Sequence, residues 1–139
     1  MDFIKKIGAE WPLRIGLGTM FLWSGFDMMQ HPKGWTWAIP LWFTQAVVDP
    51  LGTETYFKIQ GASEILLGLV LLAWFLPKIV TKYAALLTTV EIAAILFLGK
   101  TGIDAVTFRD LGVLGAALAL FVHLHDQVST APSGTIVIK

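Results

Sequence analysis

The 139-residue chain contains no cysteine, and only 14% of its residues are charged. Without cysteine it has no disulfides, thiolate metal ligands or thiol chemistry of its own, so any redox role requires a bound molecule or a partner. Ten basic and ten acidic side chains give a formal net charge of zero. No overall field therefore attracts nucleic acid, and we predict no nucleic-acid partner.

The scarcity of charge is matched by an excess of apolar residues. Hydrophobic residues make up 55% of the chain, and the mean hydropathy is +0.70. Soluble domains carry about a quarter charged residues, so this balance predicts a membrane protein. Because the sequence has no internal repeat, low-complexity tract or second domain, we expect residues 1–139 to form a single membrane domain.

Four apolar segments are candidates for membrane spans. Crossing the hydrocarbon core takes roughly 20 mostly apolar residues in a helix. The candidate segments are residues 12–29, 58–76, 79–98 and 110–125. They predict an all-α integral membrane four-helix bundle, in which a turn at Pro77-Lys78 joins the second and third helices as an antiparallel hairpin.

The connection between helices 1 and 2 has a different character. Its residues 36–48, "TWAIPLWFTQAVV", are too few to span a bilayer but are amphipathic and contain tryptophan. Tryptophan is enriched in the headgroup layer. We therefore predict an interfacial amphipathic segment that covers one end of the bundle.

The distribution of lysine and arginine predicts the orientation. Six of the ten basic residues lie on the side of the N-terminus and four on the other side. This excess favours a multi-pass protein of the cell (inner or plasma) membrane with both termini in the cytoplasm.

Ionisable residues within the spans are the candidate site residues, because a charge inside a membrane is costly. Asp27 lies in the last turn of the first span, Glu64 and Glu91 lie within the second and third, and Arg109 and Asp110 open the fourth. A helix rise of about 1.5 Å per residue places all five in the outer half of the bundle.

Helical phase indicates which faces meet. Gly18 and Gly25 share a face of the first span with Arg14, and Gly61 and Gly68 share a face of the second with Glu64. Small residues permit close helix approach and could also support homo-oligomers. We expect Arg14, near the cytoplasmic boundary, to extend to lipid phosphate.

Four carboxyl groups and one arginine cannot all be ionised in a low-dielectric site. We therefore expect at least one of Glu64 and Glu91 to carry a proton. A protonated acid beside an ionised one can donate to a carbonyl and exchange its proton, which suits quinone chemistry. Structural pairing of these glutamates with Arg109 or a lysine, and ordinary helix-end roles for Asp27 and Asp110, remain alternatives.

Metal and haem sites are not predicted. His123 and His125 are two residues apart, whereas two ligands of one metal on a helix need a spacing of three or four. The tryptophans Trp35 and Trp37 have two interpretations: they anchor the loop in the interface, or they stack on a bound ring.

Three segments carry a family resemblance: "LRIGLGTMFLWSGFDMMQHP", "GASEILLGLVLLAWFLP" and "TFRDLGVLGAALALF". In order and spacing they resemble the landmarks of the DoxX/DoxD family. The resemblance implies a four-helix membrane protein similar to the small membrane subunit of thiosulfate:quinone oxidoreductase. That subunit passes electrons from a sulfur compound to membrane quinone together with a second subunit.

Carried over by position, the resemblance implies that Glu64, Arg109 and Asp110 form the polar site. One departure is Met28, which stands where many relatives carry a basic residue; Lys33 is a candidate replacement.

The resulting hypothesis is a quinone-interacting subunit of an oxidoreductase. Glu64 and Glu91 act on the quinone, Asp27, Arg109, Asp110, Trp35 and Trp37 bind it, and a second redox subunit supplies the electrons. The expected partners are membrane lipid, quinone and that subunit. One alternative is a non-catalytic accessory subunit of a larger membrane redox complex. A small-anion or proton transporter is the other, although no pair of broken helices supports it.

Overall fold

The computed structural model describes residues 8–99 and 107–130, apart from the side chains of residues 107–109. Within these ranges the chain forms helices and no strand, so the predicted all-α class is confirmed there. The long helices are α2 (Glu10–Gln30), α5 (Thr53–Leu72), α6 (Lys78–Leu98) and α7 (Thr107–Ser129). Between α2 and α5 lie the short helices η1 (Pro32–Ala38), α3 (Leu41–Phe43), η2 (Thr44–Val48) and α4 (Asp49–Leu51).

Three helices in the described part of the chain are long and apolar enough to cross a membrane: α5, α6 and the part of α7 that begins at Asp110. They support a membrane protein. Helix α2, which covers the first expected span, is 21 residues long but is not among them. Helix α2 contains Arg14 and Asp27, whose charged side chains lower its mean hydropathy.

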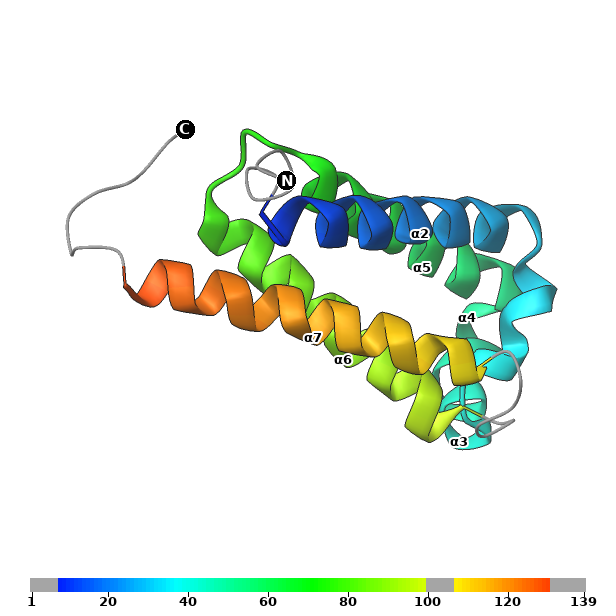
Figure 1. Ribbon diagram of the computed structural model, residues 1–139. Coiled ribbons are helices and arrows are strands. Elements are labelled where there is room, and N and C mark those ends of the chain that lie inside the picture. Colours follow the sequence, from blue (N-terminus) through cyan, green and yellow to red (C-terminus); the bar gives the residue numbers. More distant parts are fainter. Residues whose placement is uncertain (1–7, 100–106, 131–139) are drawn as a thin grey trace.

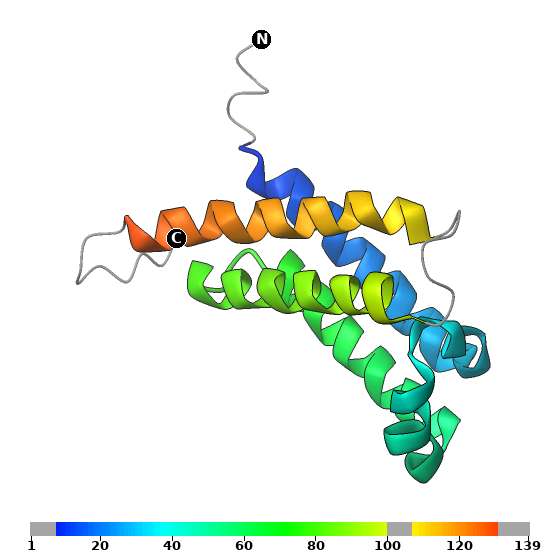
Figure 2. The same cartoon turned by 90° about the horizontal axis from the view of Figure 1, so that it is seen from below.

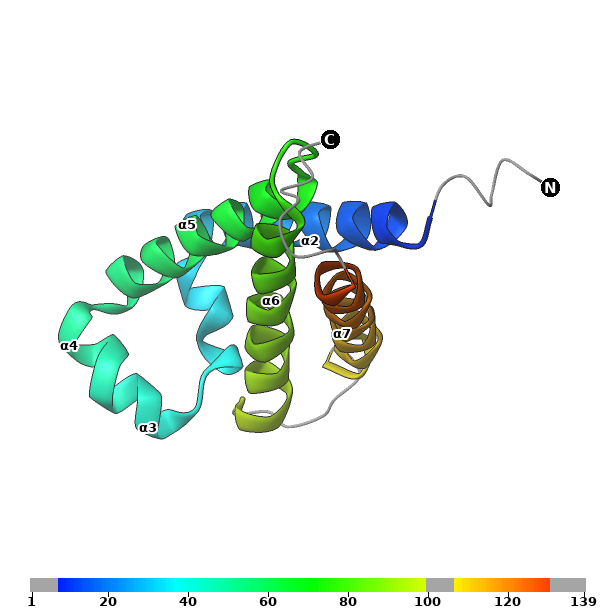
Figure 3. The same cartoon turned by 90° about the vertical axis from the view of Figure 1, so that its left-hand side faces the viewer.

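The long helices pack as two pairs. Helix α2 lies along α5, and α6 lies along α7 (Figure 1). The α2–α5 pair crosses the α6–α7 pair obliquely (Figure 2). The short helices α3 and α4 lie at the end of the molecule opposite the start of α2 and the end of α7 (Figure 3).

The connection from α5 to α6 differs from the predicted hairpin in two respects. Helix α5 ends at Leu72, not at residue 76, because Ala73 turns to an extended conformation. Pro77 directly precedes α6, and a proline disfavours the helical conformation of the residue before it. In addition, α5 packs mainly against α2 and only lightly against α6.

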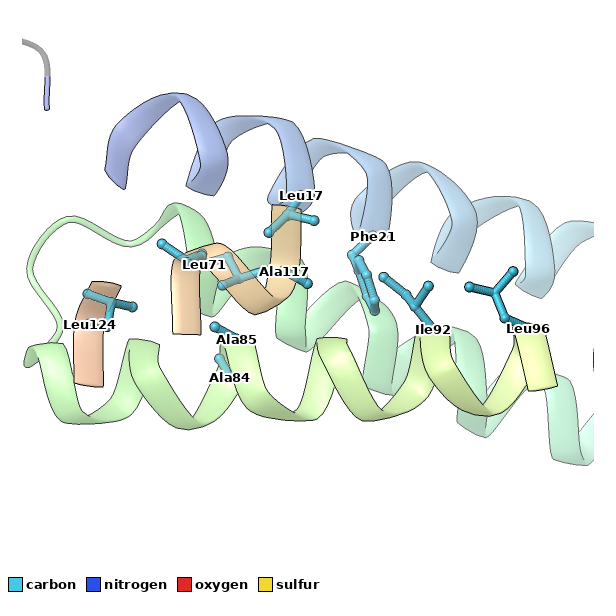
Figure 4. Close-up of a cluster of buried hydrophobic side chains, with 10 residues drawn as sticks. Leu17, Phe21, Leu71, Ala84, Ala85, Ile92, Leu96, Ala117 and Leu124 are labelled. Carbon is cyan, nitrogen blue, oxygen red and sulfur yellow. The ribbon is translucent and has the colours of Figure 1, made fainter. Parts of the chain in front are cut away.

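The hydrophobic core lies where the two pairs cross (Figure 4). Phe21 of α2 and Leu71 of α5 meet small residues of the other pair, including Ala85 and Ala117, which are fully buried. Small side chains at the crossing allow the helix backbones to approach closely, as in other membrane bundles.

Glycines create the closest contact, between α2 and α5. A Cβ atom added to Gly25 would lie 2.6 Å from the carbonyl oxygen of Gly61, and one added to Gly68 would lie 2.8 Å from that of Gly18. The glycine faces predicted from helical phase therefore meet each other. In this chain they pack within the molecule, so these four glycines are covered by the neighbouring helix.

Arg14 does not extend away from the helices, and that prediction is wrong. Arg14 is 3% exposed, and its side chain donates hydrogen bonds to the carbonyl oxygens of Leu71 and Ala73, both at 2.7 Å. It also pairs with Glu10 at 2.9 Å. Arg14 thereby satisfies carbonyl groups left unpaired where α5 ends and complements the negative end of that helix dipole.

Substitution Gly61→Ala tests the close approach. The new methyl group would meet backbone of α2, and we expect it to lower the free energy of unfolding by about 1–3 kcal/mol, a typical overpacking cost. Chemical unfolding in detergent measures the change. Gly16→Ala is the matched control, because a Cβ atom there meets nothing within 4 Å. Equal stability of the two variants would contradict the close contact.

Substitution Arg14→Met tests the capping of α5. It leaves two carbonyl groups and Glu10 without their partner, and we expect a loss of about 2–4 kcal/mol in the same unfolding assay. Lys58→Met, at an exposed position, removes a positive charge without such contacts and should change little. A variant of Arg14 as stable as the Lys58 variant would disprove the capping role.

Candidate functional site

A pair of carboxyl groups lies between α5 and α6. Glu64 of α5 is 4% exposed, Glu91 of α6 is half-buried, and the two residues line the same cavity. Two neighbouring carboxyl groups that are largely removed from water are costly to ionise together, so the pair favours holding one proton. Neutral donors complete the arrangement: the Ser24 hydroxyl donates to Glu64, and the Gln60 amide donates to Glu91.

The carboxyl pair forms part of the wall of an aromatic cavity of about 300 Å³. The short helices and the first turns of α5 contribute five aromatic side chains to its lining, and α2 and α6 contribute aliphatic ones. The aromatic residues are Trp35, Trp42, Phe43, Tyr56 and Phe57. Three of them, Phe43, Tyr56 and Phe57, form a series of edge-to-face contacts with centroids 5.8 and 5.1 Å apart. Such contacts fix the rings in place.

A second cavity, of about 440 Å³, is also lined by the pair. It is lined by Ser24 of α2, Asp110 of α7 and Trp37 of η1, together with both glutamates and Trp35. Glu64, Glu91 and Trp35 thus line both cavities. The carboxyl pair therefore forms a wall shared by two cavities. One cavity is mainly aromatic, and the other also contains Ser24 and Asp110.

A hydrogen bond holds Trp35 in this wall. The indole Nε1–H of Trp35 donates to Asp27 Oδ2 at 2.9 Å, and the ring stacks on Trp37 with centroids 6.1 Å apart. Asp27 Oδ1 also lies 3.1 Å from His31 Nδ1. Asp27 itself lines neither cavity. It connects the end of α2 to η1 and so positions the tryptophan.

The structure brings most of the predicted site residues together. Glu64, Glu91 and Trp35 meet at the shared wall, and Asp110 and Trp37 line the second cavity. Asp27 lies behind Trp35. The side chain of Arg109 lies outside the described residues. The roles assigned to all seven residues stay predictions.

Gln60, Tyr56 and Phe57 were not among the predicted site residues. Gln60 precedes Glu64 by one helical turn, so the two share a face of α5. A search for amides one turn from a buried carboxylate would have found Gln60. Tyr56 and Phe57 lie in the first turns of α5, in a stretch that the sequence prediction placed in the connection between the first two spans, and only in the folded chain do they meet the rings of the short helices.

Metal ligands do not cluster in residues 8–99 and 107–130, where no group of three His, Asp or Glu side chains is arranged to hold an ion. His123 Nε2 lies 2.6 Å from the Gln127 amide nitrogen, and the Gln127 side chain also contacts Lys78. Absence of metal and haem stays a prediction.

Comparison of the chain with protein-family models, curated proteins and solved structures finds no match. The resemblance to the DoxX/DoxD family therefore depends on the three sequence segments alone.

A double-mutant cycle with Asp27→Ala and Trp35→Phe tests the connection between Asp27 and the wall. The phenylalanine keeps an aromatic ring but removes the N–H, so the two substitutions should be non-additive in unfolding free energy. We expect a coupling of about 1–2 kcal/mol, the range for a hydrogen bond to a partly exposed charged group. Asp27→Ala with Trp37→Phe is the control pair and should be additive; equal coupling in both pairs would contradict the assignment.

Proposed function

We propose that this protein is a quinone-interacting membrane subunit of an oxidoreductase. The observation that carries the proposal is that Glu64 and Glu91 lie together in the wall of an aromatic cavity. Ligand cavities are mostly apolar, with a few polar groups that fix orientation. A quinone matches both features of this cavity. Its flat ring can stack on the aromatic side chains, and its carbonyl oxygens can accept hydrogen bonds from a protonated carboxyl group.

In this proposal the quinone ring occupies the aromatic cavity, with one carbonyl directed at the carboxyl pair. The protonated member of the pair donates to that oxygen, and Gln60 steadies Glu91. Two-electron reduction of a quinone to a quinol takes up two protons, and the carboxyl pair passes protons to the carbonyl oxygens as the electrons arrive. Asp110 and Arg109 fix the other carbonyl or a small anion.

The electrons come from a second subunit. Because the chain has no cysteine and is proposed to hold no metal or haem, the partner must carry a redox cofactor. By its resemblance to the DoxX/DoxD family, the primary donor is a sulfur compound.

The proposed membrane arrangement uses α2 as a fourth span beside α5, α6 and α7, as a four-helix bundle of the cell membrane with both termini in the cytoplasm. The short helices from η1 to α4 then lie at the outer interface, where their tryptophans are favoured. Trp42 and Leu41 are 62% and 60% exposed, as side chains in contact with lipid would be. Quinone would enter the aromatic cavity sideways from the bilayer.

The test is the quinone content of protein purified from native membranes in mild detergent, measured by solvent extraction and mass spectrometry. We expect near-stoichiometric quinone in the unaltered protein. Glu64→Gln and Glu91→Gln should lower quinone occupancy by about tenfold, since each removes a carboxyl group from the pair. Glu54→Gln is the matched control, because it makes the same change at an exposed position of α5.

Quinone at bulk-lipid levels in the unaltered protein and in all variants would reject the proposal. That outcome would favour the accessory-subunit interpretation, in which the buried carboxyl groups serve helix packing alone.

A further inference from the structure

The charge of the aromatic cavity has one sign. Two carboxyl groups line it, and among the described residues around it none is lysine, arginine or histidine. The same is true of the second cavity, where Asp110 adds a third carboxyl group. Asp110 lines the second cavity only, so among the described residues the acidic groups of the aromatic cavity are Glu64 and Glu91.

The remaining wall of the aromatic cavity is suited to a positive charge. Five aromatic side chains line the same cavity as the carboxyl pair: Trp35, Trp42, Phe43, Tyr56 and Phe57. The faces of aromatic rings attract cations, and aromatic cages bind quaternary ammonium groups in this way. A cavity of about 300 Å³ is at the lower end of the size range for small organic ligands.

We propose that the aromatic cavity is also a binding site for a lipophilic organic cation, an aromatic or alkyl ammonium compound, which pairs with the carboxyl groups of Glu64 and Glu91 in exchange for a proton. This site does not depend on the quinone proposal, because it follows from the charge and the rings of the cavity. An organic ion fits better than a metal ion, since most of the wall is carbon and offers few oxygen ligands.

The exchange balances in charge. Before binding, the two carboxyl groups hold one proton; after binding, the cation neutralises one carboxylate in place of that proton, which leaves to solvent. Among the described residues, the titratable and polar groups that line the two cavities together with the pair include Tyr56 and Gln60 of α5, Ser24 of α2 and Asp110 of α7. Gln60 and Ser24 carry no charge and stabilise the ionised carboxylates that the cation would pair with.

The test uses isothermal titration of purified protein in detergent with benzyltrimethylammonium. This probe has no proton to lose, so any proton released comes from the protein. Titrations in two buffers of different ionisation enthalpy give the number of protons released, and we expect about one per bound cation. Neopentylbenzene is the neutral isostere and should bind more weakly and release none.

Variants locate the site. Glu64→Gln and Glu91→Gln should each weaken binding of the cation by about tenfold or more while leaving the isostere unaffected. Glu54→Gln, which removes an exposed carboxylate of the same helix, should bind both probes as the unaltered protein does.

Equal affinity of the unaltered protein for the cation and its isostere, or cation binding without proton release, would overturn the proposal, and neither result requires a variant to fold. Cation binding that survives in both glutamate variants would also overturn it. Retained cation binding in a protein that purifies without quinone would reject the quinone proposal alone, so the two failures are distinguishable.

Discussion

The contact between the glycines of α2 and α5 is the constraint on which the rest of the structure depends. Gly25 and Gly61 bring the two backbones so close that a single methyl group would collide with the opposite chain. Ser24 is the neighbour of Gly25, and Glu64 lies one turn beyond Gly61. The close approach therefore places the Ser24 hydroxyl against Glu64. A larger residue at either glycine would separate the donor from the carboxyl group as well as the helices.

The second feature of the molecule is the way in which its buried charges are accommodated. Arg14 does not neutralise the glutamates; it pairs with Glu10 and with carbonyl groups at the end of α5. Glu64 and Glu91 instead line the same cavity and accept hydrogen bonds from neutral donors. No lysine, arginine or histidine of the described residues lines that cavity with them. The pair can therefore hold a proton or, as we infer, exchange it for a positively charged ligand.

The aromatic segment between α2 and α5 connects this pair to the end of the molecule. Asp27 holds Trp35, and Trp35 stands in the wall of both cavities beside the two glutamates. The position of the wall thus depends on a residue outside it. The two proposed ligands, a quinone and an organic cation, would contact the same rings and the same carboxyl groups. They would therefore compete for the same cavity.

The sequence by itself determined the helical class, the apolar helices and the glycine faces, because these follow from composition and from the 3.6-residue period. It also identified Glu64 and Glu91 as candidates, since ionisable groups are rare in apolar segments. Only the tertiary structure decided that α5 pairs with α2 more than with α6, that Arg14 caps α5, and that Gln60 and the rings of the short helices complete the site. These contacts join residues far apart in the chain, and local sequence patterns carry no information about which distant surfaces will pack together.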